Sequence, residues 1–589
     1  MIHPLKIKFQ KRPLLLGAVF FSLLLSAACL IFFFGRDPDR RFEDYTEALF
    51  RREVAGNTIS LHFTLQEPAA YGIHDAPISL GQVSTDPEEI SAAAENALAL
   101  LHRHDREKLS GENRLTYDIL EHSLSNSLRE SAYALYEEPL APLTGTQAQL
   151  PVLLSEYRFS NRDDVETYLK LLDQVPVYFQ SILKFEEARS REGLFMSAQS
   201  ADAVVEECRT FLELEEENYL YSSFRERLKE LSLSQEDLDA YCRENAAAVE
   251  RSVFPAYQDL MDGILALRDT GKNSGGLCHF PEGESYYEIL ASVETGSDRS
   301  VPELQALTRQ QLAQDLLDLQ EALEAYSGSG DGSISSDLFK PQGEMLSDTN
   351  PASILAYLEE KIAGEFPDPP QADTQIKYVQ ESMQEYLSPA FYLIPAIDNP
   401  GENVIYINPG HLGDDISLFT TLAHEGYPGH LYQTTYFAGQ DPDPIRSLLD
   451  FGGYTEGWAT YTEMISYYYA PMDHDLATLM QKNASILLGL YALADMGIHY
   501  DGWSLLDTID FFRSYGITET DVIEEIYQLI LGDPANYLKY YIGYVEFLEL
   551  KKEAIRRWGD DFSQEKFHKA VLEVGPAPFD LLREYVVGS

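Results

Sequence analysis

Residues 420–463 read TTLAHEGYPGHLYQTTYFAGQDPDPIRSLLDFGGYTEGWATYTE. His424 and Glu425 are adjacent in this stretch, and His430 follows six residues after His424. Glu456 comes 26 residues after His430, in a second segment that we expect to be helical. Neutral imidazole and carboxylate are common zinc ligands, and a catalytic zinc keeps its fourth position for water. We therefore predict that His424, His430 and Glu456 bind Zn2+. Glu425 would then take the proton of the water as general base.

The six-residue spacing of the two histidines does not fit a regular helix. Six residues at 100° each place them about 240° apart and roughly 9 Å along the axis, too far for one ion. Gly426, Pro428 and Gly429 stand between them; Pro removes an intrahelical hydrogen bond, and Gly permits unusual backbone angles. We expect a bulge or break that returns His430 to the side of His424. The alternative is a helix that ends at Pro428 and carries two ordinary surface histidines.

Further motifs accompany HEGYPGH and YTEGWATY in a specific order. They are LPVLLSEYRFSNRDDVETYLKLLDQVPVYFQ (150–180), FPEGESYYEIL (280–290), DMGIHYDGWS (495–504), YYIGYVEFLELKKEA (540–554) and FHKAVLEVGPAPFDLL (567–582). With these motifs the chain resembles a bacterial family known as domain of unknown function 885, which is similar to zinc metallopeptidases of the gluzincin type. The resemblance covers roughly residues 42–586 and implies a large helical, zincin-like metallopeptidase fold. The family often has an Arg before the DxGxH stretch, whereas this chain has Tyr491 at about that position.

Three more residues are candidates for the site. A peptide hydrolase needs a donor for the oxyanion that forms when water adds to the carbonyl. Tyr540 lies three residues before Gly543 and matches the YxxG pattern of the family, and His499 is the second candidate. The alternative for Tyr540 is an ordinary packing role. Glu463, seven residues after Glu456, is either a partner of a ligand histidine or a rival for the third ligand position.

The N-terminus predicts a membrane anchor. Residues 14–34 form an uncharged run of 21 apolar or small residues behind four basic residues. As a helix this run spans about 30 Å, the hydrocarbon thickness of a bilayer, and its basic flank should stay in the cytoplasm. We predict a cytoplasmic tail at 1–13, a single transmembrane anchor in the cell membrane at 14–34 and an extracytoplasmic domain at 35–589. The alternative is cleavage of this segment, with or without lipidation at Cys29.

The amino-acid composition restricts the classes of molecule that the protein could bind. The 44 basic and 96 acidic residues give a formal net charge of -52, which repels phosphate backbones and argues against nucleic acid. Cys208, Cys242 and Cys278 permit one disulfide at most, so the fold does not depend on a disulfide framework. The sequence contains no GxSxG, P-loop or CxxC motif. The expected partner is a peptide or protein substrate.

The rest of the chain predicts a mainly α-helical scaffold. Apolar residues recur at helical spacing in 88–104, 163–187 and 202–250. Loop compositions at 327–337 and 365–373 permit two lobes, at about 42–330 and 345–586. Residues 386–410 contain a turn and the alternating NVIYIN, which predicts a small β-sheet or hairpin next to the metal helix. Such a strand either binds an extended substrate through its backbone or covers the core.

These observations predict a membrane-anchored, extracytoplasmic zinc metallopeptidase. Two alternatives remain open at this point. One is a non-catalytic surface binding or scaffold protein of the same fold. The other is a zinc amidase that acts on cell-wall peptides.

Overall fold

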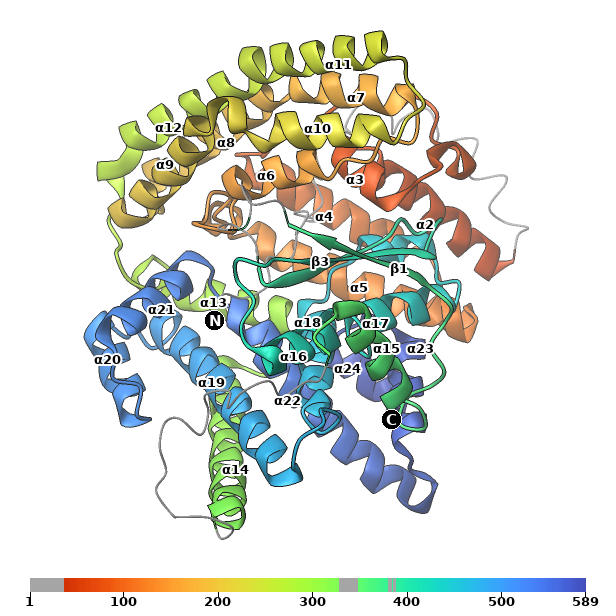
Figure 1. Cartoon of the computed structure of the whole chain (residues 1–589), viewed down its shortest axis with the longest axis vertical. Helices are drawn as coiled ribbons and strands as arrows, with labels where there is room; N and C mark the ends of the chain where they lie inside the picture. Colours follow the sequence, from red (N-terminus) through yellow and green to blue (C-terminus); the bar gives the residue numbers. More distant parts are fainter. Residues whose placement is uncertain (1–36, 328–347, 380–383, 385–387, 589) are drawn as a thin grey trace.

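The computed structural model describes residues 37–327, 348–379, 384 and 388–588. Its architecture is mainly helical with one small sheet, which confirms the predicted fold class (Figure 1). The predicted tail and anchor, Cys29 and nearly all of the loop at 327–337 lie outside these residues. Of the helices within them, none combines the length and the apolar character that a membrane crossing requires.

The N-terminal half of the described chain is built from helices alone. They are α2 (Pro38–Val54), α3 (Thr58–Thr64), α4 (Pro87–Leu101), α5 (Gly111–Ser131), α6 (Thr146–Ser155), α7 (Arg162–Leu172), α8 (Val175–Glu192), α9 (Ala198–Glu213), α10 (Tyr219–Lys229), α11 (Gln235–Ala248) and α12 (Phe254–Leu267). The charged stretch 202–250 is therefore divided among three helices. Asn218 and Ser234 divide it, because their side chains cap the first turns of α10 and α11.

The C-terminal half carries the metal-site segment. Its helices are α13 (Gly283–Thr295), α14 (Val301–Ser327), α15 (Pro351–Lys361), α16 (Asp415–Glu425), α17 (His430–Ala438), α18 (Gly452–Ser466), α19 (His474–His499), α20 (Leu505–Ser514), α21 (Thr520–Gly532), α22 (Asn536–Trp558), α23 (Gln564–Val574) and α24 (Phe579–Leu582). Helices α16, α18 and α22 pack side by side near the centre of this half (Figure 1). The division into two lobes remains a prediction.

The sheet has three strands in the order β1-β3-β2. The predicted hairpin is confirmed: β2 (Ala390–Leu393) pairs antiparallel with β3 (Glu402–Ile407). The parallel partner β1 (Asp373–Tyr378) was not predicted, because it begins at the end of the Pro-rich stretch that indicated a loop. Strand β2 contacts α16, as expected for a hairpin next to the metal helix.

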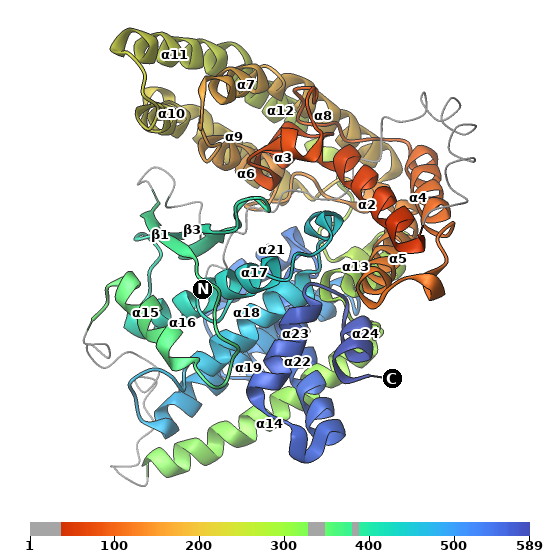
Figure 2. The same ribbon diagram turned by 90° about the vertical axis from the view of Figure 1, so that its right-hand side faces the viewer.

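The sheet lies between the N-terminal and the C-terminal helices (Figure 2), and its side chains contribute to a hydrophobic core on each side. Ile405 and Ile407 of β3 are buried in the C-terminal core, whereas Tyr406 between them is buried in the core of the N-terminal helices. Phe391 of β2 stacks on Tyr406, with ring centroids 4.8 Å apart. Successive side chains of a strand point to opposite faces, so β3 supplies both cores at once.

Candidate metal centre

The predicted break between the two histidines is confirmed. Helix α16 ends at Glu425 and α17 begins at His430, so residues 426–429 form a connection between two helices. A Cβ atom at Gly429 would lie 1.8 Å from the carbonyl oxygen of His424, which only glycine avoids. The indole Nε1 of Trp458 donates a hydrogen bond of 2.9 Å to the Pro428 carbonyl and fixes this connection from α18.

The break brings the three predicted ligands together. His424, His430 and Glu456 are buried, and one ligand atom from each lies within 4.8 Å of the other two. Glu456 Oε2 is 3.7 Å from His424 Nε2 and 3.5 Å from His430 Nε2. Within the described part of the chain, His424 Nε2 has no hydrogen-bond partner. Two imidazoles and one carboxylate at these distances could hold a metal ion, and this donor set fits zinc.

Glu463 contacts the back of this cluster. The Nδ1–H group of His424 donates to Glu463 Oε2 over 3.0 Å, which turns Nε2 toward Glu456. Of the two roles considered for Glu463, this contact supports the partner of a ligand histidine. Burial lowers the pKa of His424, but the contacts with Glu456 and Glu463 outweigh it and raise the pKa to about 10. The surrounding carboxylates therefore favour a cation at this place.

Glu425 is held by the sheet. Its carboxylate is buried, and Oε2 accepts a hydrogen bond of 2.8 Å from the backbone N–H of Tyr392 on β2. The sequence carried no signal for this contact, because the donor is a backbone group on a strand 33 residues earlier. The general-base candidate is thus fixed beside the predicted ligands from the strand side.

Tyr540 reaches the same place from α22. Helices α18 and α22 approach closely, since a Cβ atom at Gly457 would lie 2.5 Å from the Cα atom of Gly543. The ring of Tyr540 consequently stacks on His424, with centroids 6.5 Å apart. Burial raises the pKa of Tyr540 well above its usual value, and the charge of Glu456 adds to the shift. Tyr540 therefore keeps its proton and can donate it in a hydrogen bond.

His499 has a different environment. Its Nδ1 accepts from the backbone N–H of Leu277 at 3.2 Å, and its Nε2–H donates to the carbonyl of Ile530 at 2.9 Å. Burial lowers its pKa to about 4, so the ring is neutral at pH 7. Both ring nitrogens of His499 are thus occupied by hydrogen bonds to backbone groups. These bonds disfavour His499 as the oxyanion donor. In the same motif Asp495 Oδ1 accepts from the backbone N–H of Ala535, just before α22.

A family model described as "Bacterial protein of unknown function (DUF885)" matches residues 71–586. No curated protein matches the chain.

Three solved structures are similar to this chain over most of its length. A "putative lipoprotein" from Colwellia psychrerythraea has a TM-score of 0.77 and 20% identity, over 92% of this chain and 98% of that chain. A "putative lipoprotein of unknown function" from Shewanella oneidensis has a TM-score of 0.63 and 15% identity, over 93% and 98%. A "putative oligoendopeptidase F" from Bacillus anthracis str. Ames has a TM-score of 0.32 and 11% identity, over 84% and 92%. The first two share the fold with this chain.

Proposed function

This chain belongs to the DUF885 family, and we propose that it is a zinc-dependent peptidase that hydrolyses peptide bonds with activated water. The observation that carries the proposal is the buried group of His424, His430 and Glu456, whose ligand atoms lie within 4.8 Å of one another. When bound there, Zn2+ would polarise the scissile carbonyl and make water a better nucleophile.

The neighbouring side chains supply the rest of the chemistry. Glu425 is the general base: its carboxylate is adjacent in sequence to a ligand and held by Tyr392, so it can take a proton from water without moving far. Tyr540 is the oxyanion donor, because its hydroxyl stays protonated beside the cluster. Glu463 fixes the ring orientation of His424.

Strand β2 is the proposed binding edge for an extended substrate. It lies at the edge of the sheet and contacts α16, and its Tyr392 already holds the general base. A peptide added to this edge as a further strand would have its backbone close to Glu425.

We also propose that the protein acts outside the cytoplasm at a membrane. The apolar run at 14–34 supports this location, as do the descriptions of two structurally similar proteins as lipoproteins. The chemical state of the mature N-terminus distinguishes a transmembrane anchor from a lipid anchor. Mass spectrometry of membrane-extracted protein should find either an intact N-terminus or a lipidated Cys29, and an unmodified soluble form would contradict both.

The activity is tested by metal analysis and digestion of a peptide library. Wild-type protein should bind one zinc per chain and cleave peptides. Glu425→Gln should keep the zinc and lose activity by orders of magnitude, because the amide cannot take a proton. His430→Ala should lose the zinc. Glu360→Gln, at an exposed position of α15, is the matched control for Glu425→Gln.

The same experiment separates the alternatives. Full zinc occupancy in His430→Ala would contradict the assigned ligands. A zinc-loaded protein that cleaves muropeptides and no ordinary peptide would favour the amidase. Failure to bind zinc at all would favour a non-catalytic binding protein.

A further inference from the structure

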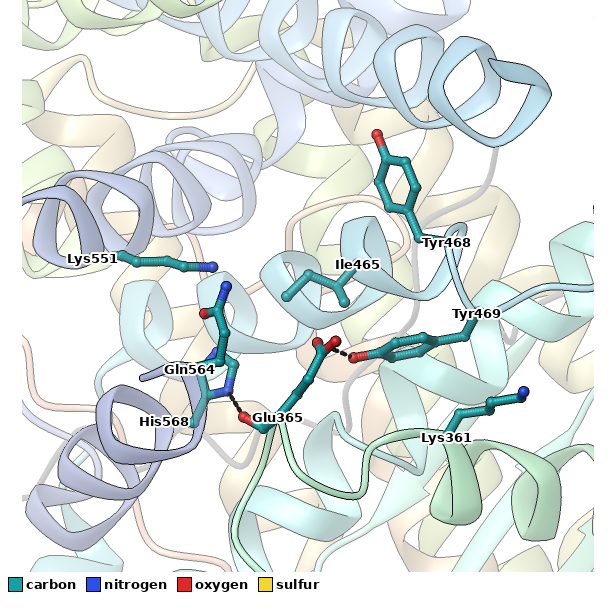
Figure 3. A pocket seen from close by; sticks show the side chains of 8 residues that line it. All are labelled: Lys361, Glu365, Ile465, Tyr468, Tyr469, Lys551, Gln564 and His568. Carbon is teal, nitrogen blue, oxygen red and sulfur yellow. Dashed lines mark hydrogen bonds between the residues drawn. The ribbon is translucent and has the colours of Figure 1, made fainter. Parts of the chain in front are cut away.

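A cavity of about 490 Å³ lies between the end of α18, the middle of α22, the start of α23 and the segment after α15 (Figure 3). No residue of its lining belongs to the candidate metal centre. Its volume is in the range of about 300–1,000 Å³ that is typical of small-molecule sites. The proposed peptidase mechanism does not use it.

Three charged side chains line this cavity: Lys361, Lys551 and Glu365. Lys361 is exposed and its ammonium lies over the ring of Tyr357, whereas Lys551 and Glu365 lie on different walls and form no ion pair with each other. Lys551 is half-buried, and its Nζ donates to the hydroxyl of Tyr461 at 2.9 Å, but it forms no ion pair with any described carboxylate. Glu365 belongs to another wall, where its Oε2 accepts from the hydroxyl of Tyr469 at 2.8 Å (Figure 3). Burial lowers the pKa of Lys551 to about 8, and the charge of Glu365 opposes that shift. The ammonium therefore lacks a direct counterion within the described structure.

The rest of the lining includes a polar side chain, Gln564, and an apolar surface formed by Ile465 and Tyr468. The amide oxygen of Gln564 has no hydrogen-bond partner among the described residues, so this side chain can turn toward a ligand without breaking a bond at that atom. Ile465 and Tyr468 supply apolar surface, and Tyr468 is 42% exposed to solvent. His568 is fixed in place, because its Nδ1–H donates to the carbonyl of Glu365 at 2.6 Å.

We propose that this cavity binds a zwitterion, namely a free amino acid or a short peptide with an apolar side chain. The ligand carboxylate would contact Lys551, and its ammonium would contact Glu365 and Gln564. A simple anion would leave Glu365 without a counterion and a simple cation would leave Lys551 without one, whereas a zwitterion pairs with both. The ligand side chain would lie on Ile465 and Tyr468. The site goes beyond the proposed peptidase activity and does not depend on the metal.

Calorimetric titration of the full-length, detergent-solubilised protein tests this site. A chelator removes metal first, so that an amino acid cannot bind through zinc. The probes are leucine, N-acetyl-leucine, which lacks the ammonium, and leucinamide, which lacks the carboxylate. Leucine should bind at least tenfold more tightly than either blocked form, and equal binding of a blocked form or absence of leucine binding would overturn the proposal.

Variants locate the binding. Lys551→Met and Glu365→Gln should each weaken leucine binding at least tenfold, while Lys552→Met, the next and exposed position on α22, should leave it unchanged. Glu365 is exposed, so its variant reports on the site even if Lys551→Met unfolds. Wild-type affinity in folded Lys551→Met or Glu365→Gln would overturn the assignment. Because metal is absent throughout, these results are independent of peptidase activity.

Discussion

Replacing Gly429 by Ala should strongly weaken metal binding while most of the fold survives. The new Cβ would lie 1.8 Å from the His424 carbonyl oxygen, whereas ordinary contact begins at 3.4 Å, so these atoms must separate by about 1.6 Å. Metal–ligand distances tolerate only about 0.2 Å. Gly429 directly precedes His430, so one of the two histidine ligands has to move. We expect zinc affinity to fall at least about 100-fold, or about 3 kcal/mol. Overpacking should lower the free energy of unfolding by about 1–3 kcal/mol.

Zinc affinity is measured by competition with a chromophoric chelator, and folding by thermal unfolding of the metal-free protein. Gly401→Ala is the matched control, since a Cβ there meets no atom within 4 Å. It should bind zinc like the wild type. If Gly429→Ala binds zinc within about threefold of the wild type and melts at the same temperature, the close approach at the break does not position the ligands.

Three further substitutions test Tyr540, Glu463 and Asp495. Tyr540→Phe should keep zinc and lower kcat about 10²–10³-fold, because it removes a donor used in the transition state; steady-state kinetics with an unchanged kcat would exclude that role. Glu463→Gln should weaken zinc binding about 10–100-fold through His424, and the same competition assay would reveal an unaffected, purely structural Glu463. Burial raises the pKa of Asp495 from 3.8 to about 7, so its favourable contribution to folding is complete below pH 3.8 and is lost as the pH rises to 7. Denaturant unfolding should therefore show wild type losing stability relative to Asp495→Asn between pH 4 and pH 7, on the order of 4 kcal/mol, and a constant difference would contradict the shift.

Local chemistry explains what the sequence could predict. Gly426, Pro428 and Gly429 interrupt a helix by their own backbone preferences, so the approach of His424 and His430 followed from neighbouring residues. In the same way, the alternating side chains of NVIYIN were sufficient to predict strand β3.

Long-range contacts explain what the sequence could not predict. Strand β1 is an exposed, short segment after several prolines, and only its parallel pairing with β3 makes it a strand. The environment of His499 depends on Leu277 and Ile530, which lie far away in the chain. Its motif indicated importance and gave no information on which groups would occupy its nitrogens.

The position of β3 between two cores also has a consequence for biosynthesis. The N-terminal helices end with α12 at Leu267, but their core contains Phe391 and Tyr406. About 140 residues must be translated after Leu267 before Tyr406 exists, which takes roughly 7 to 28 s at about 5–20 residues per second. For that time the emerging helices expose the apolar surface that the strands later cover. The N-terminal half therefore completes its core only after the hairpin has been made.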